Sequence, residues 1–127
     1  MSMRTLRTFV VAAWVVALAA CAKDAPKVIP NQIQGRWVTQ AAGYENRYLQ
    51  LEKDFVLIGV GRDVTPSIQR VYRVESEGNG RQATYRIYST GYETDDVLTL
   101  YFDPANGGEI RLKNQGGLVW KRVPVPE

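Results

Sequence analysis

From Ile33 onward the chain alternates apolar and polar residues in short runs that turn residues separate. This alternation is typical of half-buried strands, because successive side chains of a strand point to opposite faces of the sheet. Gly78-Asn79-Gly80 is a strong hairpin signal, since glycine and asparagine adopt positive φ at little cost. The one helical candidate, residues 41–48, is weakened by Gly43. We predict eight strands, at residues 35–40, 47–52, 55–61, 68–77, 82–90, 96–103, 109–113 and 118–123.

Short strands joined by tight turns predict an antiparallel meander. An open meander leaves two unpaired edges, and closure into a barrel removes both. The interior of an eight-stranded barrel is just filled by side chains, or holds one small ligand. We therefore predict an all-β fold, in which residues 33–123 form one small closed barrel and residues 124–127 form a tail. A half-open sheet or a two-sheet sandwich is the structural alternative.

Residues 1–20 have the organisation of a secretion signal. Arg4 and Arg7 form a basic start without an acid, and the apolar run Phe9–Ala20 follows. As a helix this run is about 18 Å long, whereas a membrane-spanning helix needs roughly 20 apolar residues. The segment is therefore too short for a permanent anchor, and it predicts a signal peptide that is cleaved in front of Cys21.

The residues at this cleavage site, Leu18-Ala19-Ala20-Cys21, resemble the lipobox of bacterial lipoproteins. The resemblance implies that Leu18, Ala19 and Ala20 are read by the signal peptidase. It also implies that Cys21 is diacylated on sulfur and then acylated on its new amine. In that family an Asp after the cysteine favours the inner membrane. Ala22 therefore implies the outer membrane, facing the periplasm, in a Gram-negative host. The alternative is an ordinary cleaved signal with an unrelated cysteine.

Residues 21–32 are predicted to form the lipidated cysteine and a flexible tether, because prolines and scattered charges interrupt any apolar period. Fully extended, the tether reaches about 35–40 Å.

Charge excludes one class of partner. Two of the 16 Lys and Arg residues, Arg4 and Arg7, leave with the signal, while all 13 acids stay. The mature chain is almost neutral and lacks the basic field that nucleic-acid binding needs.

The chain contains no histidine, and Cys21 is its only cysteine. Ser-His-Asp and Cys-His catalytic systems are excluded, as are zinc sites built on His or Cys. The acids Glu93, Asp95 and Asp96 could hold calcium through oxygen ligands. We interpret them as a solvated turn, and we interpret residues 103–108 as a hairpin turn. Catalysis by a carboxylate pair or a Ser-Lys pair stays open as an alternative, but we predict a protein without catalytic activity, cofactor or metal.

At Gly35-Arg36-Trp37 the chain resembles the lipocalin-like proteins, whose first strand opens with Gly-x-Trp. In that family the tryptophan plugs the closed end of the barrel, and an arginine near the last strand packs over it. The resemblance implies that Gly35, Trp37 and Arg122 pack together at one barrel end. The chain is shorter than a full-length lipocalin, so any cavity is expected to be small.

Two functions follow as expectations. The first is a binding or assembly module for a protein or another envelope partner. The alternative is a lipocalin-like carrier or sensor of a small apolar ligand. The interior of the barrel can distinguish the two functions, because an interior filled by large side chains leaves no room for a ligand. The side chains expected inside are Trp37, Leu51, Leu100 and Trp120.

Overall fold

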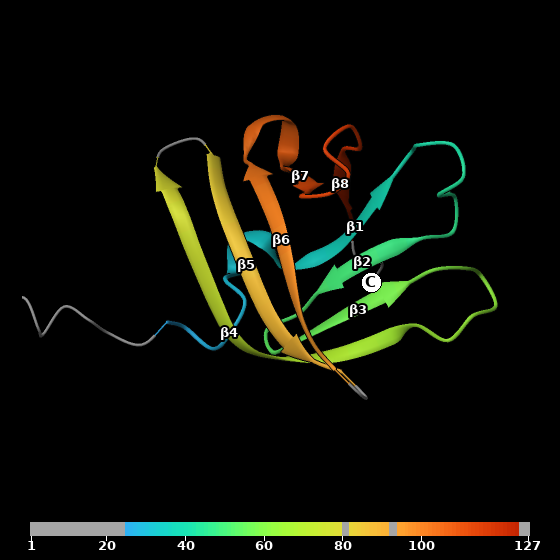
Figure 1. Cartoon of the computed structure of the whole chain (residues 1–127). Helices are drawn as coiled ribbons and strands as arrows, with labels where there is room; N and C mark the ends of the chain where they lie inside the picture. The colour runs from blue at the N-terminus through green and yellow to red at the C-terminus, as the bar shows by residue number, and fades with distance from the viewer. Residues whose placement is uncertain (1–24, 80–81, 92–93, 125–127) are drawn as a thin grey trace, which may run out of the picture.

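The computed structural model describes residues 25–79, 82–91 and 94–124, and Figure 1 shows their arrangement. Eight antiparallel strands pair in chain order, and the first pairs with the last to close a barrel. The predicted all-β fold and barrel closure are thereby confirmed. Within these ranges no helix is long and apolar enough to cross a membrane. The elements are η2 (Asn31–Ile33), β1 (Gly35–Thr39), β2 (Tyr48–Leu51), β3 (Phe55–Gly59), β4 (Ser67–Asn79), β5 (Gln82–Thr90), β6 (Asp95–Asp103), η3 (Ala105–Gly107), β7 (Glu109–Leu112) and β8 (Trp120–Val123).

The strands differ in length, and this difference shapes the barrel. β4 has 13 residues and β5 and β6 have 9 each, whereas the other five strands have 4 or 5. A register shift between Val71 and Arg73 marks a bulge in β4. Such bulges bend a strand, and Figure 1 shows β4 curving from the short strands towards β5. The long strands therefore extend past their short neighbours.

The core follows the alternation of the sequence. In β5 the side chains of Tyr85, Ile87 and Ser89 are buried, whereas Arg86 and Tyr88 between them point to the outer face. Tyr85 and Tyr88 thus lie on opposite faces, as three-residue spacing on a strand predicts. Each fully buried aliphatic side chain contributes roughly 1.5–3 kcal/mol of transfer free energy. The fully buried side chains include Trp37, Ile33, Leu51, Ile87, Leu100 and Ile110.

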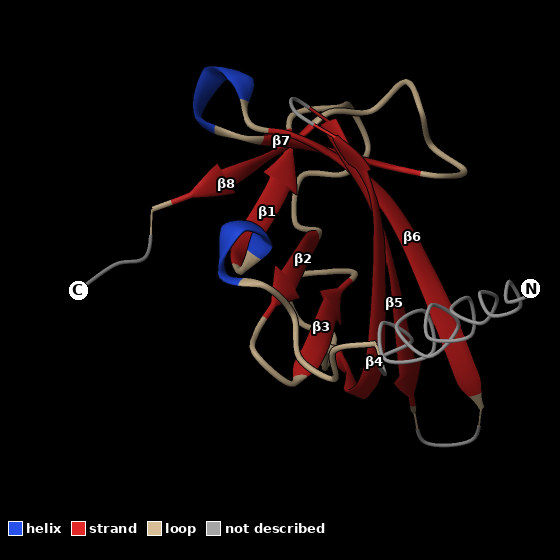
Figure 2. Ribbon diagram, turned by 90° about the vertical axis from the view of Figure 1, so that its left-hand side faces the viewer, coloured by secondary structure: helices blue, strands red, loops and turns tan. Residues whose placement is uncertain are grey.

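The segment in front of β1 differs from the predicted free tether, because its second half packs on the barrel. Ile29 is 1% exposed, and its N–H donates to the carbonyl of Lys53 at 2.8 Å. The carbonyl of Pro26 accepts the N–H of Val74 in β4, also at 2.8 Å. Ile33 follows in η2, which lies beside β1 in Figure 2. Within the described residues, the segment from Pro26 onward is therefore part of the packed domain, because Ile29 and Ile33 bury their side chains.

Shortening the buried side chain of this segment should destabilise the whole barrel. We expect Ile29→Ala to lower the free energy of unfolding by about 2–4 kcal/mol, as aliphatic truncations in cores do. The neighbouring Val28 is 40% exposed, so Val28→Ala should change it by less than about 0.5 kcal/mol. Urea denaturation of residues 22–127 measures both variants. Equal losses for the two would show that the segment is not part of the core.

Candidate functional site

One end of the barrel is closed by the residues of the Gly-x-Trp segment and the last strand. The indole Nε1–H of Trp37, which is fully buried, donates to the carbonyl of Ile33 at 3.0 Å. The guanidinium of Arg122 lies 4.6 Å from the centre of the Trp37 ring and donates to the carbonyl of Gln32. Gly35 has φ +131°, a conformation that a side chain disfavours, and an added Cβ would lie 3.4 Å from Arg122. Stacking of a cation on an aromatic face stabilises this arrangement.

The barrel interior is filled by side chains. Trp37, Leu51 and Leu100 are 0% exposed, and Trp120 is 5% exposed. Phe102 packs edge-on against Trp37, with ring centres 6.3 Å apart. These are the residues whose burial argues against a ligand in the centre of the barrel. Binding by this domain must therefore use its mouth, its outer face or a strand edge.

The opposite end of the barrel carries a second aromatic pair. Tyr44, in the loop between β1 and β2, packs edge-on against Trp120 with ring centres 6.2 Å apart. The indole Nε1–H of Trp120 is buried and has no hydrogen-bond partner within the described part of the chain, and the same holds for Oε1 of Gln115. A buried polar atom without a partner costs about 1–3 kcal/mol. Two polar atoms at this end therefore have unused hydrogen-bonding capacity.

Beside this end, β6 has an unpaired edge. On one side, β5 pairs with β6 from Asp95, the first residue of β6. On the other side, β7 pairs with β6 only from Leu100 to Asp103. The last bond on that side runs from the N–H of Lys113 to the carbonyl of Thr99, at 3.0 Å. Alternate residues of a strand direct their backbone groups to the same side, so the N–H and C=O of Val97 point to this side too. In the described ranges no strand pairs with the first four residues of β6 on that side.

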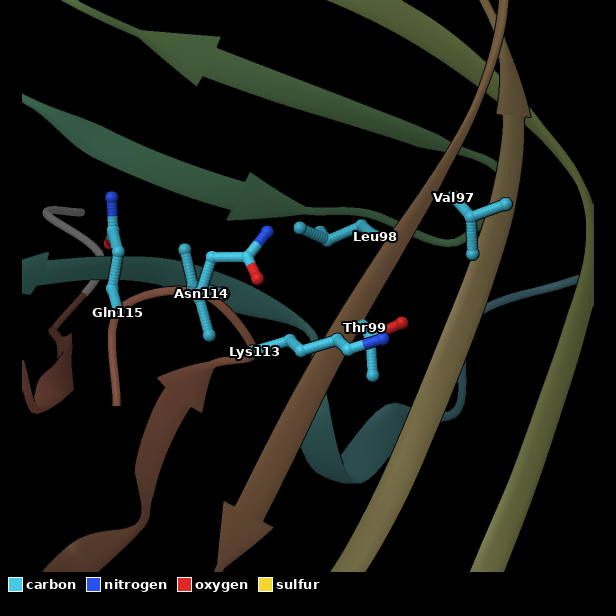
Figure 3. A pocket seen from close by; sticks show the side chains of 7 residues that line it. Val97, Leu98, Thr99, Lys113, Asn114 and Gln115 are labelled. Carbon is cyan, nitrogen blue, oxygen red and sulfur yellow. The ribbon is translucent and has the colours of Figure 1, made fainter.

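A groove with a volume of about 410 Å³ runs along this edge. Figure 3 shows the side chains of Leu98 and Asn114 directed towards each other and Lys113 alongside Thr99. The groove thus combines an unpaired backbone edge with a lining that is about half apolar and half polar. No motif in the sequence marks the groove. It forms because β7 pairs only with Leu100 to Asp103 and does not reach the first residues of β6. The lining residues are Val97, Leu98, Thr99, Leu112, Lys113, Asn114 and Gln115.

The outer face of β4 and β5 carries a network of charged side chains. Glu75 accepts hydrogen bonds from Arg73 at 2.6 Å and from the hydroxyl of Tyr88 at 3.0 Å. Arg86 pairs with Glu77 at 3.0 Å. The hydrogen bond from Tyr88, followed by that from Arg73, lowers the pKa of Glu75, and the same bond to Glu75 raises the pKa of Tyr88. We interpret the network as a set of cross-strand side-chain pairs that stabilise a solvent-exposed face of the sheet.

Removing the tyrosine hydroxyl should show in the titration of Glu75. In Tyr88→Phe we expect the pKa of Glu75 to rise towards its usual value, measured from its side-chain carboxyl ¹³C shift by NMR. A lowered pKa in the folded state stabilises the protein above the unfolded pKa, and this contribution is lost as pH falls through the folded pKa. Tyr88→Phe should therefore weaken the acid dependence of stability. Tyr101→Phe, on another exposed strand position, should leave the pKa of Glu75 unchanged; an equal shift there would contradict the assignment.

The acids that sequence alone offered as a calcium site are not gathered into one. Asp95 and Asp96 begin β6, and Asp96 accepts a hydrogen bond from Gln69 at 3.1 Å. Glu93 lies outside the described residues. Among the residues that are described, no three His, Cys, Asp or Glu side chains are placed to hold a metal ion. At residues 103–108, Asp103 accepts the N–H of Ala105 at 2.9 Å, and these residues form the predicted hairpin turn between β6 and β7.

The predicted lipidation site Cys21 and its recognition residues Leu18, Ala19 and Ala20 also lie outside the described residues. In the part of the chain that the structure describes, the groove along β6 combines a pocket with an unpaired stretch of strand backbone. A second, larger pocket of about 590 Å³ is lined by Asp54, Phe55, Ile68, Arg70, Thr90 and Gly91. Comparison of this chain with protein-family models, curated proteins and solved structures found no match.

Proposed function

We propose that this protein is a lipid-anchored lipoprotein of a bacterial cell envelope, and that its barrel is a non-catalytic docking module. In this proposal the module binds an extended segment of a partner protein along the free edge of β6. The observation that carries the proposal is the backbone of Val97, with which no strand of the described ranges pairs on the side of a groove of about 410 Å³. An exposed sheet edge of this kind accepts an extended peptide as an additional strand.

The chemistry of the groove defines the partner segment. The N–H and C=O of Val97 supply main-chain hydrogen bonds, which depend little on sequence. Leu98 and Leu112 offer apolar contacts to alternate side chains of the incoming strand. Asp95 and Asp96 are exposed at the start of β6. We therefore expect a segment with an apolar residue at its centre and a basic residue at the end that meets these two acids.

The anchor rests on the N-terminal sequence. The lipobox-like Leu18-Ala19-Ala20-Cys21 supports cleavage in front of Cys21 and acylation of that residue. Two or more acyl chains hold a protein stably on a bilayer, because each buried CH₂ contributes about 0.8 kcal/mol. Ala22 favours the outer membrane, with the barrel in the periplasm of a Gram-negative host. Absence of histidine from the sequence supports a role without catalysis.

A carrier of a small apolar ligand is the second candidate. It is supported by the groove volume of about 410 Å³, which falls within the range of small-molecule pockets. The side chains of Lys113, Asn114 and Gln115, which line the groove, could form hydrogen bonds with a polar group of such a ligand. The ligand would have to bind in the groove, since Trp37, Leu51 and Leu100 occupy the interior.

Native mass spectrometry of residues 22–127, secreted without lipid and purified gently, separates the two candidates. The docking proposal predicts the mass of the bare chain. A reproducible additional mass of a few hundred daltons would instead support the carrier. Asn114→Ala removes a polar side chain that lines the groove, so this variant should lose a ligand bound there while remaining folded.

A further inference from the structure

The segment that links the proposed anchor to the barrel is itself bound to the barrel. The carbonyl of Pro26 accepts the N–H of Val74, and the N–H of Ile29 donates to the carbonyl of Lys53. The Ile29 side chain is buried in the core. Among the described residues, the contact of Pro26 with the barrel is the first along the chain, and Pro26 comes five residues after Cys21. The inference below rests on the proposed lipid anchor at Cys21.

We infer that the lipid surface faces the closed end of the barrel at short range, and that the opposite end points away from the bilayer. Five residues span at most about 17 Å when fully extended, whereas a chain that is free up to Ile33 would span about 40 Å. The docked segment thus shortens the distance between membrane and domain by more than half. It also fixes the point of attachment on β4, beside Val74.

The topology determines which surfaces this attachment places away from the membrane. In an up-and-down barrel successive hairpins lie at alternate ends. The β2–β3 turn, which binds Ile29, therefore lies at the anchored end. The β1–β2, β3–β4 and β7–β8 loops lie at the other. In Figure 1 the β3–β4 loop is at the right and the N-terminal segment, in blue, is at the left. The β7–β8 loop contributes Asn114 and Gln115 to the groove, so the groove opens away from the anchoring bilayer.

The orientation can be measured on the lipidated full-length protein in vesicles. Acylation blocks the thiol of Cys21, so an introduced cysteine is the only free thiol. One variant is Lys53→Cys, in the β2–β3 turn, and the other is Asp63→Cys, in the β3–β4 loop; both positions are exposed. Each is labelled with a donor dye and reconstituted in phosphatidylethanolamine–phosphatidylglycerol vesicles that contain a headgroup-labelled acceptor lipid.

We expect energy transfer to the headgroups to be about twofold or more stronger from position 53 than from position 63, because the five-residue link keeps only the closed end near the bilayer. Insertion of ten Gly and Ser residues between Cys21 and Pro26 should make the two equal. Equal energy transfer from positions 53 and 63 without the insertion, in protein that floats with the vesicles, would refute the proposed orientation but not the lipid anchor. Protein that does not float would refute the lipid anchor, and the inference with it.

Discussion

Replacing Cys21 with serine should move the protein from the membrane fraction to the soluble fraction. The sulfur of Cys21 is the proposed site of the diacylglyceryl group, and serine offers no thiol for its transfer. One acyl chain gives only marginal membrane binding and two give stable binding, so loss of all chains should release the domain completely. Ultracentrifugation of membranes after osmotic lysis, followed by detection of the barrel in both fractions, measures the result.

The control for this experiment is Ala22→Ser, which changes the neighbouring residue and keeps the thiol. It should stay in the membrane fraction. The intact mass of each product shows whether residues 1–20 have been removed, so that an uncleaved precursor is not mistaken for an anchored protein. A Cys21→Ser protein that has lost residues 1–20 and still sediments with membranes would refute the lipid anchor.

Truncation of the tryptophan at the closed end should cause the largest loss of stability. We expect Trp37→Ala to lower the free energy of unfolding by about 3–5 kcal/mol, as large-to-small aromatic changes in cores do. The variant loses a fully buried side chain, the hydrogen bond to the carbonyl of Ile33 and the stacking surface of Arg122. In a domain of this size such a loss lowers the Tm by more than about 10 °C. Calorimetry of residues 22–127 measures it.

Tyr72 supplies a matched aromatic control, because it is 44% exposed on β4. Tyr72→Ala should cost less than about 1 kcal/mol, since it leaves no cavity in the core. Arg122→Leu separates the stacking contribution and should cost about 1 kcal/mol. A Trp37→Ala protein that melts at the same temperature as Tyr72→Ala would contradict the packing of the closed end.

The strands could be predicted from the sequence because their signals are local. In β5 the alternation Tyr85-Arg86-Ile87 fixes which side chains enter the core. The signal Gly78-Asn79-Gly80 predicts the β4–β5 hairpin, although Gly78 and Asn79 themselves still pair with β5 as the last residues of β4. The number and order of strands then restrict the fold to a barrel or a closely related sheet. All eight predicted strands are present, with bounds that differ by a few residues.

The groove and the docked N-terminal segment could not be predicted in this way. The groove exists because β7 ends at Leu112 while β6 continues past its partner, and this depends on the register between strands. Ile29 lies between Pro26 and Pro30, in a segment without an apolar period. Its side chain is buried by core residues that are distant in the sequence, and its N–H donates to the carbonyl of Lys53. Both features arise from long-range pairing, which one sequence does not encode as a local pattern.

The most direct test of the docking proposal is site-specific photo-crosslinking in cells, with a photoreactive amino acid at Asn114 in the groove. Val97→Pro removes the N–H on the free side of β6, where proline is tolerated because no bond to β5 is lost. Val97→Thr retains that N–H and serves as control. We predict a crosslink to an extended partner segment that is retained in Val97→Thr and reduced about tenfold in Val97→Pro, as loss of main-chain pairing requires. A crosslink of equal yield in both variants would contradict strand addition at this edge.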